Sequence, residues 1–322
     1  MAYSAGDTIL DDEYNTFVNS SSDPYGYNHF AGTGAGSYGL GQTHIGTVVA
    51  GDNTVTASSW NSLFTGMDNI SNHTNVSITA SSVTAGDTIA VRSALISDLA
   101  NLAAAVAGGS TSATAISESS ELQSSVSSTR WVGSHIVEHS ITFSNNADLR
   151  HFFNAGGTMR MKLTRNGNGG SGATSKDSSV DELISACGNF DLKAQVSTRS
   201  GSGESLTDGL ANGAADLDAS YTQLMILTQS SGTYTSMNLK VEAKTNNTDY
   251  TDATVITMKY SLTDPDSGDG EFTSGNTSGV DQYANFIGQT DFALHTVNPT
   301  TAQGLASVAA IASSAVVSNN TA

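Results

Sequence analysis

The stretch from His135 to Phe143 has the sequence His-Ile-Val-Glu-His-Ser-Ile-Thr-Phe. Every second side chain from Val137 to Phe143 is bulky, and the side chains between them are polar. An alternation with a period of two is typical of a β-strand that buries one face. This stretch therefore predicts that the chain turns to β-structure from about residue 130.

The same character recurs further along the chain. Short helices fit 148–154 and 179–186, and turns rich in Gly, Ser and Asn separate the apolar runs. Further strands are predicted at 159–164, 190–198, 224–229, 237–244, 255–262 and 292–297. Several strands joined by such turns indicate a mainly β fold class, with a C-terminal β-sandwich-like domain that carries short helices.

The preceding part is rich in Gly and carries a short repeat, Ala-Gly-Asp, at 5–7, 50–52 and 85–87. Each copy leads into helical spacing, most clearly after Thr56, which can cap a helix, as can Ser58. Four members of that helix's apolar stripe are candidate assembly residues: Trp60, Leu63, Phe64 and Met67. Because such small units bury little of their own stripes, we expect a neighbour to cover them.

Composition divides the chain into four parts. We expect an attachment region at 1–107, a Ser/Thr/Ala linker at 108–129, a β-rich domain at 130–298 and a small-residue tail at 299–322. The linker has almost no bulky side chain to pack. The tail is expected to dock on a neighbour or to fray.

Charge excludes several classes of function. The chain has 12 Lys and Arg against 30 Asp and Glu, a net charge of −18. Such a surface repels phosphate backbones, which argues against a nucleic-acid partner. The sequence has no basic amphipathic stretch and no apolar run long enough to span a bilayer, so we expect no membrane insertion. The start of the chain does not resemble a signal peptide. The single Cys187 excludes an internal disulfide framework and is expected to be buried.

The residues from His135 to His139 also match the zinc-peptidase pattern H-x-x-E-H. That chemistry needs a helix, on which both imidazoles project to one metal. On a strand the two residues lie about 13 Å apart, too far for a single zinc with bonds of about 2.0–2.1 Å. We therefore expect a strand here and no zinc site.

One acidic run is a weak calcium candidate. It contains four carboxylates near two glycines, at Asp264, Asp266, Asp269 and Glu271. Closely spaced oxygen ligands suit Ca²⁺, but the spacing is not that of an EF-hand loop. A solvated acidic hairpin tip is the favoured interpretation.

The run from Gly34 to Gly39 matches the nucleotide-binding pattern G-x-G-x-x-G. A dinucleotide site needs a strand before this pattern and a helix after it, and the sequence predicts neither, so we predict no cofactor.

Three stretches together resemble virion proteins of tailed bacteriophages, in particular tail-fibre and other tail-associated proteins. The first is Tyr-Gly-Leu-Gly-Gln at 38–42, followed by Ala-Gly-Asp at 50–52 and Thr-Ala-Ser-Ser-Trp-Asn-Ser-Leu at 56–63. The second runs from 143 to 160 and contains the turn residues Phe152, Phe153, Asn154, Gly156 and Gly157. The third comprises two late strands at 238–243 and 255–260.

This resemblance implies a non-enzymatic structural component of a phage particle, assembled in the host cytoplasm and placed in a fibre, baseplate or neck. Its partners would be other virion proteins and copies of itself, with a trimer common among fibre-like proteins. The alternative is an adhesin that recognises host surface glycan through exposed groups such as Asp281, Tyr283, Asn285 and Phe286. A third hypothesis, a virion-borne hydrolase, requires a carboxylate pair in a groove.

Overall fold

The computed structural model divides into two compact units. The helical unit comprises Met1–Ser117, Asn145–Gly157 and Asn298–Ala310, and the sandwich unit comprises Glu118–Ser144, Thr158–Val297 and Ile311–Ala322. The structure describes residues 11–34, 38–48, 55–87, 92–127, 130–131, 133–166, 175–230, 234–265, 286–287, 289–305, 308 and 310–321.

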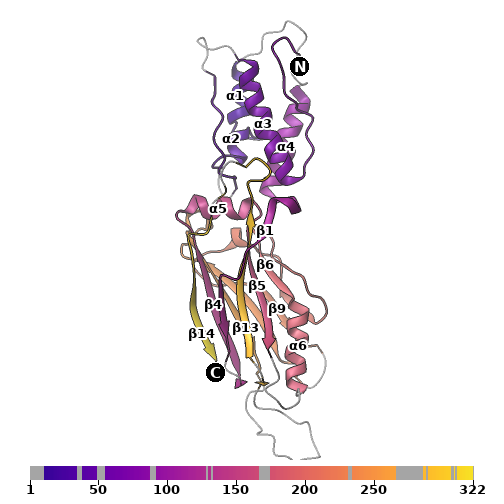
Figure 1. Cartoon of the computed structure of the whole chain (residues 1–322), viewed down its shortest axis with the longest axis vertical. Helices are drawn as coiled ribbons and strands as arrows, with labels where there is room; N and C mark the ends of the chain where they lie inside the picture. The colour runs from indigo at the N-terminus through magenta and orange to yellow at the C-terminus, as the bar shows by residue number, and fades with distance from the viewer. Residues whose placement is uncertain are drawn as a thin grey trace, which may run out of the picture. The chain divides into compact units, whose positions relative to one another are not determined.

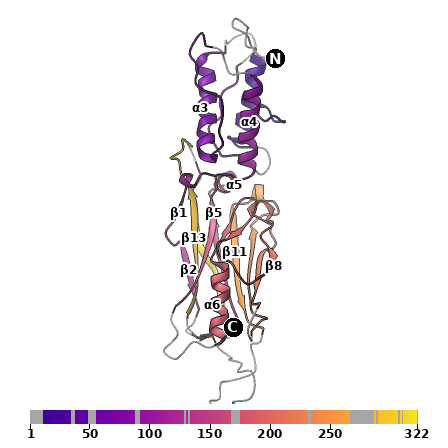
Figure 2. The same cartoon turned by 90° about the vertical axis from the view of Figure 1, so that its right-hand side faces the viewer.

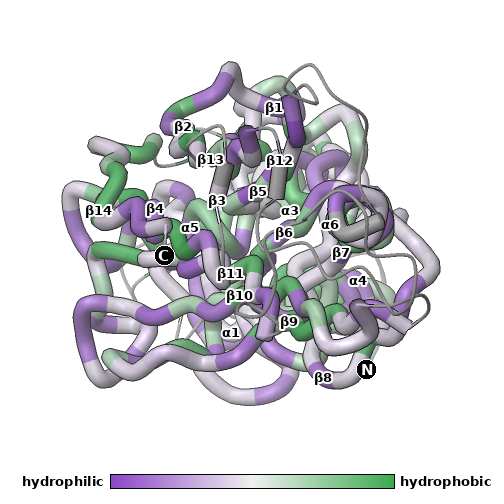
Figure 3. Tube along the Cα trace, turned by 90° about the horizontal axis from the view of Figure 1, so that it is seen from below, coloured by the Kyte–Doolittle hydropathy of each residue, from purple (hydrophilic) through white to green (hydrophobic). Residues whose placement is uncertain are grey.

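The sandwich unit contains two six-stranded antiparallel sheets, seen end-on as two rows of strands in Figure 3. The first sheet has the order β1-β13-β5-β6-β7, with β2 also paired to β13: β1 (Ile116–Glu118), β13 (Gln289–Pro299), β5 (Thr158–Asn166), β6 (Asn189–Leu192), β7 (Thr198–Arg199) and β2 (Gln123–Val126). The second sheet has the order β14 (Ser313–Thr321), β4 (Ser134–Thr142), β11 (Val255–Thr263), β10 (Asn238–Thr245), β9 (Thr222–Thr228) and β8 (Ser205–Gly209). A further pair joins β3 (Arg130–Trp131) to β12 (Phe286–Ile287).

The two sheets share one apolar interior. On β11, Tyr260 stacks on Phe292 of β13 with ring centroids 5.4 Å apart and planes at 12°. Both side chains are fully buried. Alternate residues of β4, β10 and β11 point to the same interior, as the period-two pattern requires. The predicted fold class, mainly β with a sandwich-like C-terminal domain and short helices, is confirmed.

Helix α6 (Ser175–Cys187) runs along one side of the sandwich unit (Figure 2). It contacts β5 and β9. It carries Cys187, which is fully buried, and burial raises the pKa of its thiol to about 12. This cysteine is therefore a small core residue, as expected, rather than a thiolate nucleophile.

The helical unit contains α1 (Asp11–Asn19), α2 (Tyr27–Phe30), α3 (Ala57–Thr74), α4 (Arg92–Ala107) and α5 (Asn146–Asn154). Helices α3 and α4 lie side by side (Figure 1). Thr56 caps α3, since its side chain accepts the Ser59 backbone N–H at 3.2 Å. Trp60 lies at the centre of the core, with ring centroids 5.3 Å from Tyr14 and 5.6 Å from Phe64.

The expected linker and tail contain defined structure. In 108–129 the chain forms a 3₁₀ turn at Ala113–Ala115 and then β1 and β2. Residues 123–126 of β2 pair with 291–294 of β13. In the tail, β14 pairs with β4 from Ser313↔Thr142 to Thr321↔His135. Small polar residues satisfy a β ladder as well as bulky ones do, because the ladder uses only backbone groups.

The predicted strand at 190–198 is interrupted. Strand β6 ends at Leu192 and β7 begins at Thr198. Between them, the carbonyls of Lys193 and Ala194 accept the backbone N–H groups of Ala214 and Ala215 at 2.8 and 2.9 Å. Those carbonyls bind a 3₁₀ turn at Ala214–Asp216 instead of a neighbouring strand, so the ladder stops there.

Leu63→Ala tests the core of the helical unit. Leu63 is fully buried on α3. Truncation leaves a cavity and should lower the free energy of unfolding of this unit by about 2–5 kcal/mol. Urea denaturation followed by Trp60 fluorescence in a Trp131→Phe background measures it. The same change at Leu206, which is 38% exposed, should cost about 0.5 kcal/mol or less. Equal losses at both positions would contradict the assigned core.

Candidate functional site

His135 and His139, the ends of the zinc-like pattern, point into the interior of the sandwich unit from β4. His139 Nε2 lies 3.1 Å from Ser125 Oγ of β2, and His135 Nε2 lies 3.1 Å from Asn319 Oδ1 of β14. Each imidazole therefore has its own partner. The prediction of a strand here is confirmed. Within the described ranges, no group of three His, Cys, Asp or Glu side chains is placed to hold a metal ion.

Burial keeps both imidazoles neutral at neutral pH. It lowers the pKa of His139 to about 4. Burial also lowers the pKa of His135, against the opposing effect of its bond to Asn319. In the unfolded chain each histidine titrates near 6.5. Between these values the unfolded state binds more protons than the folded state, so stability falls as the pH falls.

We expect His139 to account for about 3 kcal/mol of stability that is lost between pH 6.5 and pH 4. His139→Gln removes the titrating group, so its free energy of unfolding should depend less steeply on pH in that window. Denaturant unfolding at half-unit pH steps measures the slope. His44→Gln, at an exposed histidine, is the control. If H139Q leaves the slope at its wild-type value, His139 titrates normally in the folded state.

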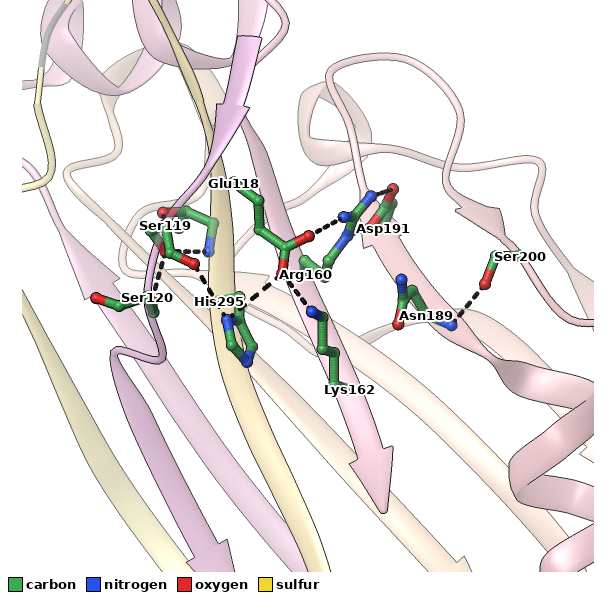
Figure 4. Close-up of polar contacts among 10 residues, drawn as sticks. Glu118, Ser119, Ser120, Arg160, Lys162, Asn189, Asp191, Ser200 and His295 are labelled. Atoms are coloured by element: carbon green, nitrogen blue, oxygen red, sulfur yellow. Dashed lines mark hydrogen bonds and ion pairs between the residues drawn. The ribbon is translucent and has the colours of Figure 1, made fainter.

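Charged side chains form a cluster on the face of the first sheet that points away from the sandwich interior (Figure 4). Arg160 on β5 binds both carboxylate oxygens of Asp191 on β6, at 2.7 and 2.8 Å. Its Nη1 lies 2.6 Å from Glu118 Oε2 on β1, and Lys162 binds the other oxygen of Glu118. His295 Nδ1 of β13 lies 3.7 Å from Glu118 Oε1.

Glu118 and Arg160 of this cluster are suited to holding strands together rather than to moving protons. Hydrogen bonds from Lys162, and then from Arg160, hold the pKa of Glu118 below its ordinary value. Asp191 raises the pKa of Arg160 still further above neutrality. A general acid or base needs a pKa near the working pH, and neither group has one. The cluster joins β1, which lies in the expected linker, to β5 and β6.

Arg160→Met should lower the free energy of unfolding by about 1–3 kcal/mol, because it leaves Asp191 without its bidentate partner and removes one donor to Glu118. Asp191→Asn and the double variant complete a cycle whose coupling energy should reach about 1 kcal/mol. Lys240→Met is the control, because Lys240 is a third exposed and pairs with Glu242 at 3.0 Å. A coupling energy of zero would mean that the cluster contributes nothing to stability.

The acidic run is only partly described. Asp264 is buried, and its backbone N–H donates to the carbonyl of Gly133 at 2.7 Å. The other three candidate ligands, Asp266, Asp269 and Glu271, lie outside the described residues. Three of the possible glycan contacts, Asp281, Tyr283 and Asn285, also lie outside them, as does the side chain of Phe286. The weak calcium candidate and the glycan contacts therefore stay predictions.

The candidate assembly stripe on α3 faces inward. Trp60, Leu63, Phe64 and Met67 are at most 3% exposed. They belong to one core with side chains of α1, α2 and α4. The sequence pattern identified the right face of the helix, but residues distant in sequence cover it, so a neighbouring molecule is not needed to bury it.

Two of the stretches that carry the phage resemblance contact each other in the helical unit. Asn154 Nδ2 of α5 donates to the carbonyl of Gly39 at 3.1 Å. Gly41 has a φ of +67°, and a Cβ there would meet His151 at 2.3 Å. The motif glycines therefore serve packing: Gly156 has a φ of +85°, and a Cβ on Gly157 would meet the Phe152 carbonyl at 2.5 Å. Phe152 and Phe153 are buried, with rings 5.2 Å apart.

Of the five large apolar side chains that are exposed in the described part of the chain, three lie at the β14 edge of the sandwich unit. Val316 and Val317 of β14 are 40% and 54% exposed, and Val126 of β2 is 40% exposed. Asn319 Nδ2 donates to the carbonyl of Val126 at 3.4 Å, which places the two strands together. A bulge between Val316 and Ser318 leaves Val317 as the extra residue. Two adjacent valines in a polar tail were the signal available in the sequence.

Comparisons of this chain with protein-family models, with curated proteins and with solved structures find no match. Among the residues described here, no helix is both long and apolar enough to cross a membrane. Function must therefore be argued from the surfaces of the chain itself.

Proposed function

We propose that this chain is a non-enzymatic structural component of a tailed-phage particle, tail-associated, that works by assembling with copies of itself and with other virion proteins. The resemblance of the stretches at 38–63 and 143–160 supports the phage context. The observation that carries the assembly role is the exposure of β14.

Strand β14 lies at the rim of its sheet, beside β4 (Figure 3). Seven of its nine residues are exposed and two are half-buried, so most of its surface is uncovered beyond its contacts with β4 and β2. An uncovered strand with adjacent valines exposes apolar surface that a neighbour can bury. The bulge interrupts its backbone ladder, so we assign the contact to the side chains of Val316 and Val317.

The charge of the two rim strands supports the same choice. Strand β8, at the opposite rim, contains Asp208 and follows Glu204. Strand β14 has the sequence Ser-Ser-Ala-Val-Val-Ser-Asn-Asn-Thr, without a charged residue. Copies of a chain with a net charge of −18 repel each other in general. Two copies can approach each other at an uncharged strand with the least electrostatic repulsion.

Val317→Glu tests this role. A carboxylate in the contact should weaken self-association about tenfold or more, which corresponds to about 1.4 kcal/mol. Size-exclusion chromatography with light scattering over a range of concentrations measures the mass. Val196→Glu is the matched control, since Val196 is 47% exposed and lies outside β14. A wild-type chain that stays monomeric at millimolar concentration, or equal effects of V317E and V196E, would refute assembly through β14.

The virion context needs its own test. Electron micrographs of phage particles labelled with an antibody to this chain should show label at the tail fibre, baseplate or neck. Unlabelled particles would refute that part of the proposal while leaving self-association untouched.

A further inference from the structure

The helical unit contains a groove of about 500 Å³ beside α3. Its floor is one side of α3, with Ser62, Thr65 and Asn69 spaced along successive turns. The chain from Gln42 to Gly46 forms one wall, and Tyr14 and Tyr27, which are 1% and 5% exposed, complete the lining. Drug-sized ligand sites in proteins have similar volumes, about 300–1,000 Å³.

Uncharged polar groups dominate the lining. None of the described lining residues is Asp, Glu, Lys or Arg, in a chain with 42 such residues. Three side chains of the lining, His44, Thr65 and Asn69, make no hydrogen bond to the rest of the described chain and so have donors and acceptors free for a ligand. The other lining groups include the hydroxyls of Ser58, Ser59 and Ser62.

The walls are fixed before any ligand arrives. The Asn28 side chain holds the backbone of Ile45 at both its N–H and its carbonyl, at 2.8 and 2.9 Å. Tyr14 donates its hydroxyl to the Ser59 carbonyl at 3.2 Å. The ring of Tyr27 lies against Gly66, where a Cβ would approach it to 2.7 Å. Preorganised walls reduce the entropy lost on binding.

We propose that this groove binds a neutral carbohydrate. Hydroxyl, amide and imidazole groups can both donate and accept hydrogen bonds, which matches a ligand whose own groups are hydroxyls. An anionic ligand would find no cation among the described lining residues, and the chain's net charge of −18 would repel it.

An extended neutral peptide is the competing occupant, but the groove favours it less. Peptide grooves read alternate side chains in apolar pockets. Here Ile45 is the one aliphatic side chain among the described lining residues. The groove lies in the helical unit and β14 in the sandwich unit, so this inference stands apart from self-association.

Gly46→Phe tests the groove by filling it. A Cβ on Gly46 meets nothing within 4 Å, and its φ lies outside the left-handed region, so the variant should fold. The matched control is Thr47→Phe, which adds the same ring at the neighbouring exposed residue outside the lining. Thr65→Val removes one free hydroxyl of the floor without changing its shape.

The full chain is first applied to an array of neutral and acidic oligosaccharides. The best neutral binder, an acidic oligosaccharide and a capped uncharged tetrapeptide are then titrated by calorimetry. We expect saturable binding of the neutral oligosaccharide, weakened at least tenfold by G46F and severalfold by T65V, and unchanged by T47F. Melting temperatures identify any variant that fails to fold.

Three outcomes would overturn the inference: no saturable binding of any neutral oligosaccharide at millimolar concentration, stronger binding of the acidic sugar or the peptide, or neutral-sugar binding that G46F and T65V leave intact. Each is independent of the mass measured by light scattering. A chain that self-associates but binds no sugar would keep the proposed assembly role and lose the groove.

Discussion

The contact between α5 and the turn at Gly39 and Gly41 decides how the helical unit closes. Asn154 lies 115 residues after Gly39 in sequence, yet its side-chain amide donates to the Gly39 carbonyl. The approach is possible because Gly41 has no Cβ to meet His151. Once α5 is held there, Ala155 joins the same core as Trp60. Tyr14 and Tyr27 belong both to this core and to the lining of the groove, so the packing of the core also sets the shape of the groove.

Sequence periodicity predicted the elements that bury one face. The stripe from Trp60 to Met67 and the alternation on β4 both correspond to observed elements, because a buried face needs apolar residues at the spacing of the element. Strands β2 and β14 were missed, since small polar residues satisfy a ladder without an apolar pattern. The end of β6 was also missed, because it is set by a hydrogen bond from the backbone N–H of Ala214, a residue distant in sequence, to the carbonyl of Lys193.

Candidate sites were harder to predict than elements. Sequence placed His135 and His139 on a strand but could not show that Ser125 and Asn319 would partner them. The groove has no local signature at all. In the sequence, its floor is indistinguishable from any polar face of a helix. Its wall is the segment 42–46, whose backbone is held in place by the side chain of Asn28. Sites made of ordinary hydroxyls and amides become visible only when distant segments are placed together.

The division of the chain into units also constrains its synthesis. The backbone passes between the units after residues 117, 144, 157, 297 and 310. Leu305, which is 1% exposed, belongs to the core of the helical unit. Domains commonly fold in order as they leave the ribosome. Here the unit that is translated first cannot complete its core until nearly the whole chain has emerged. A ribosome that stops early would release a product in which α1 to α4 are present but lack Ala155 and Leu305, two members of their core.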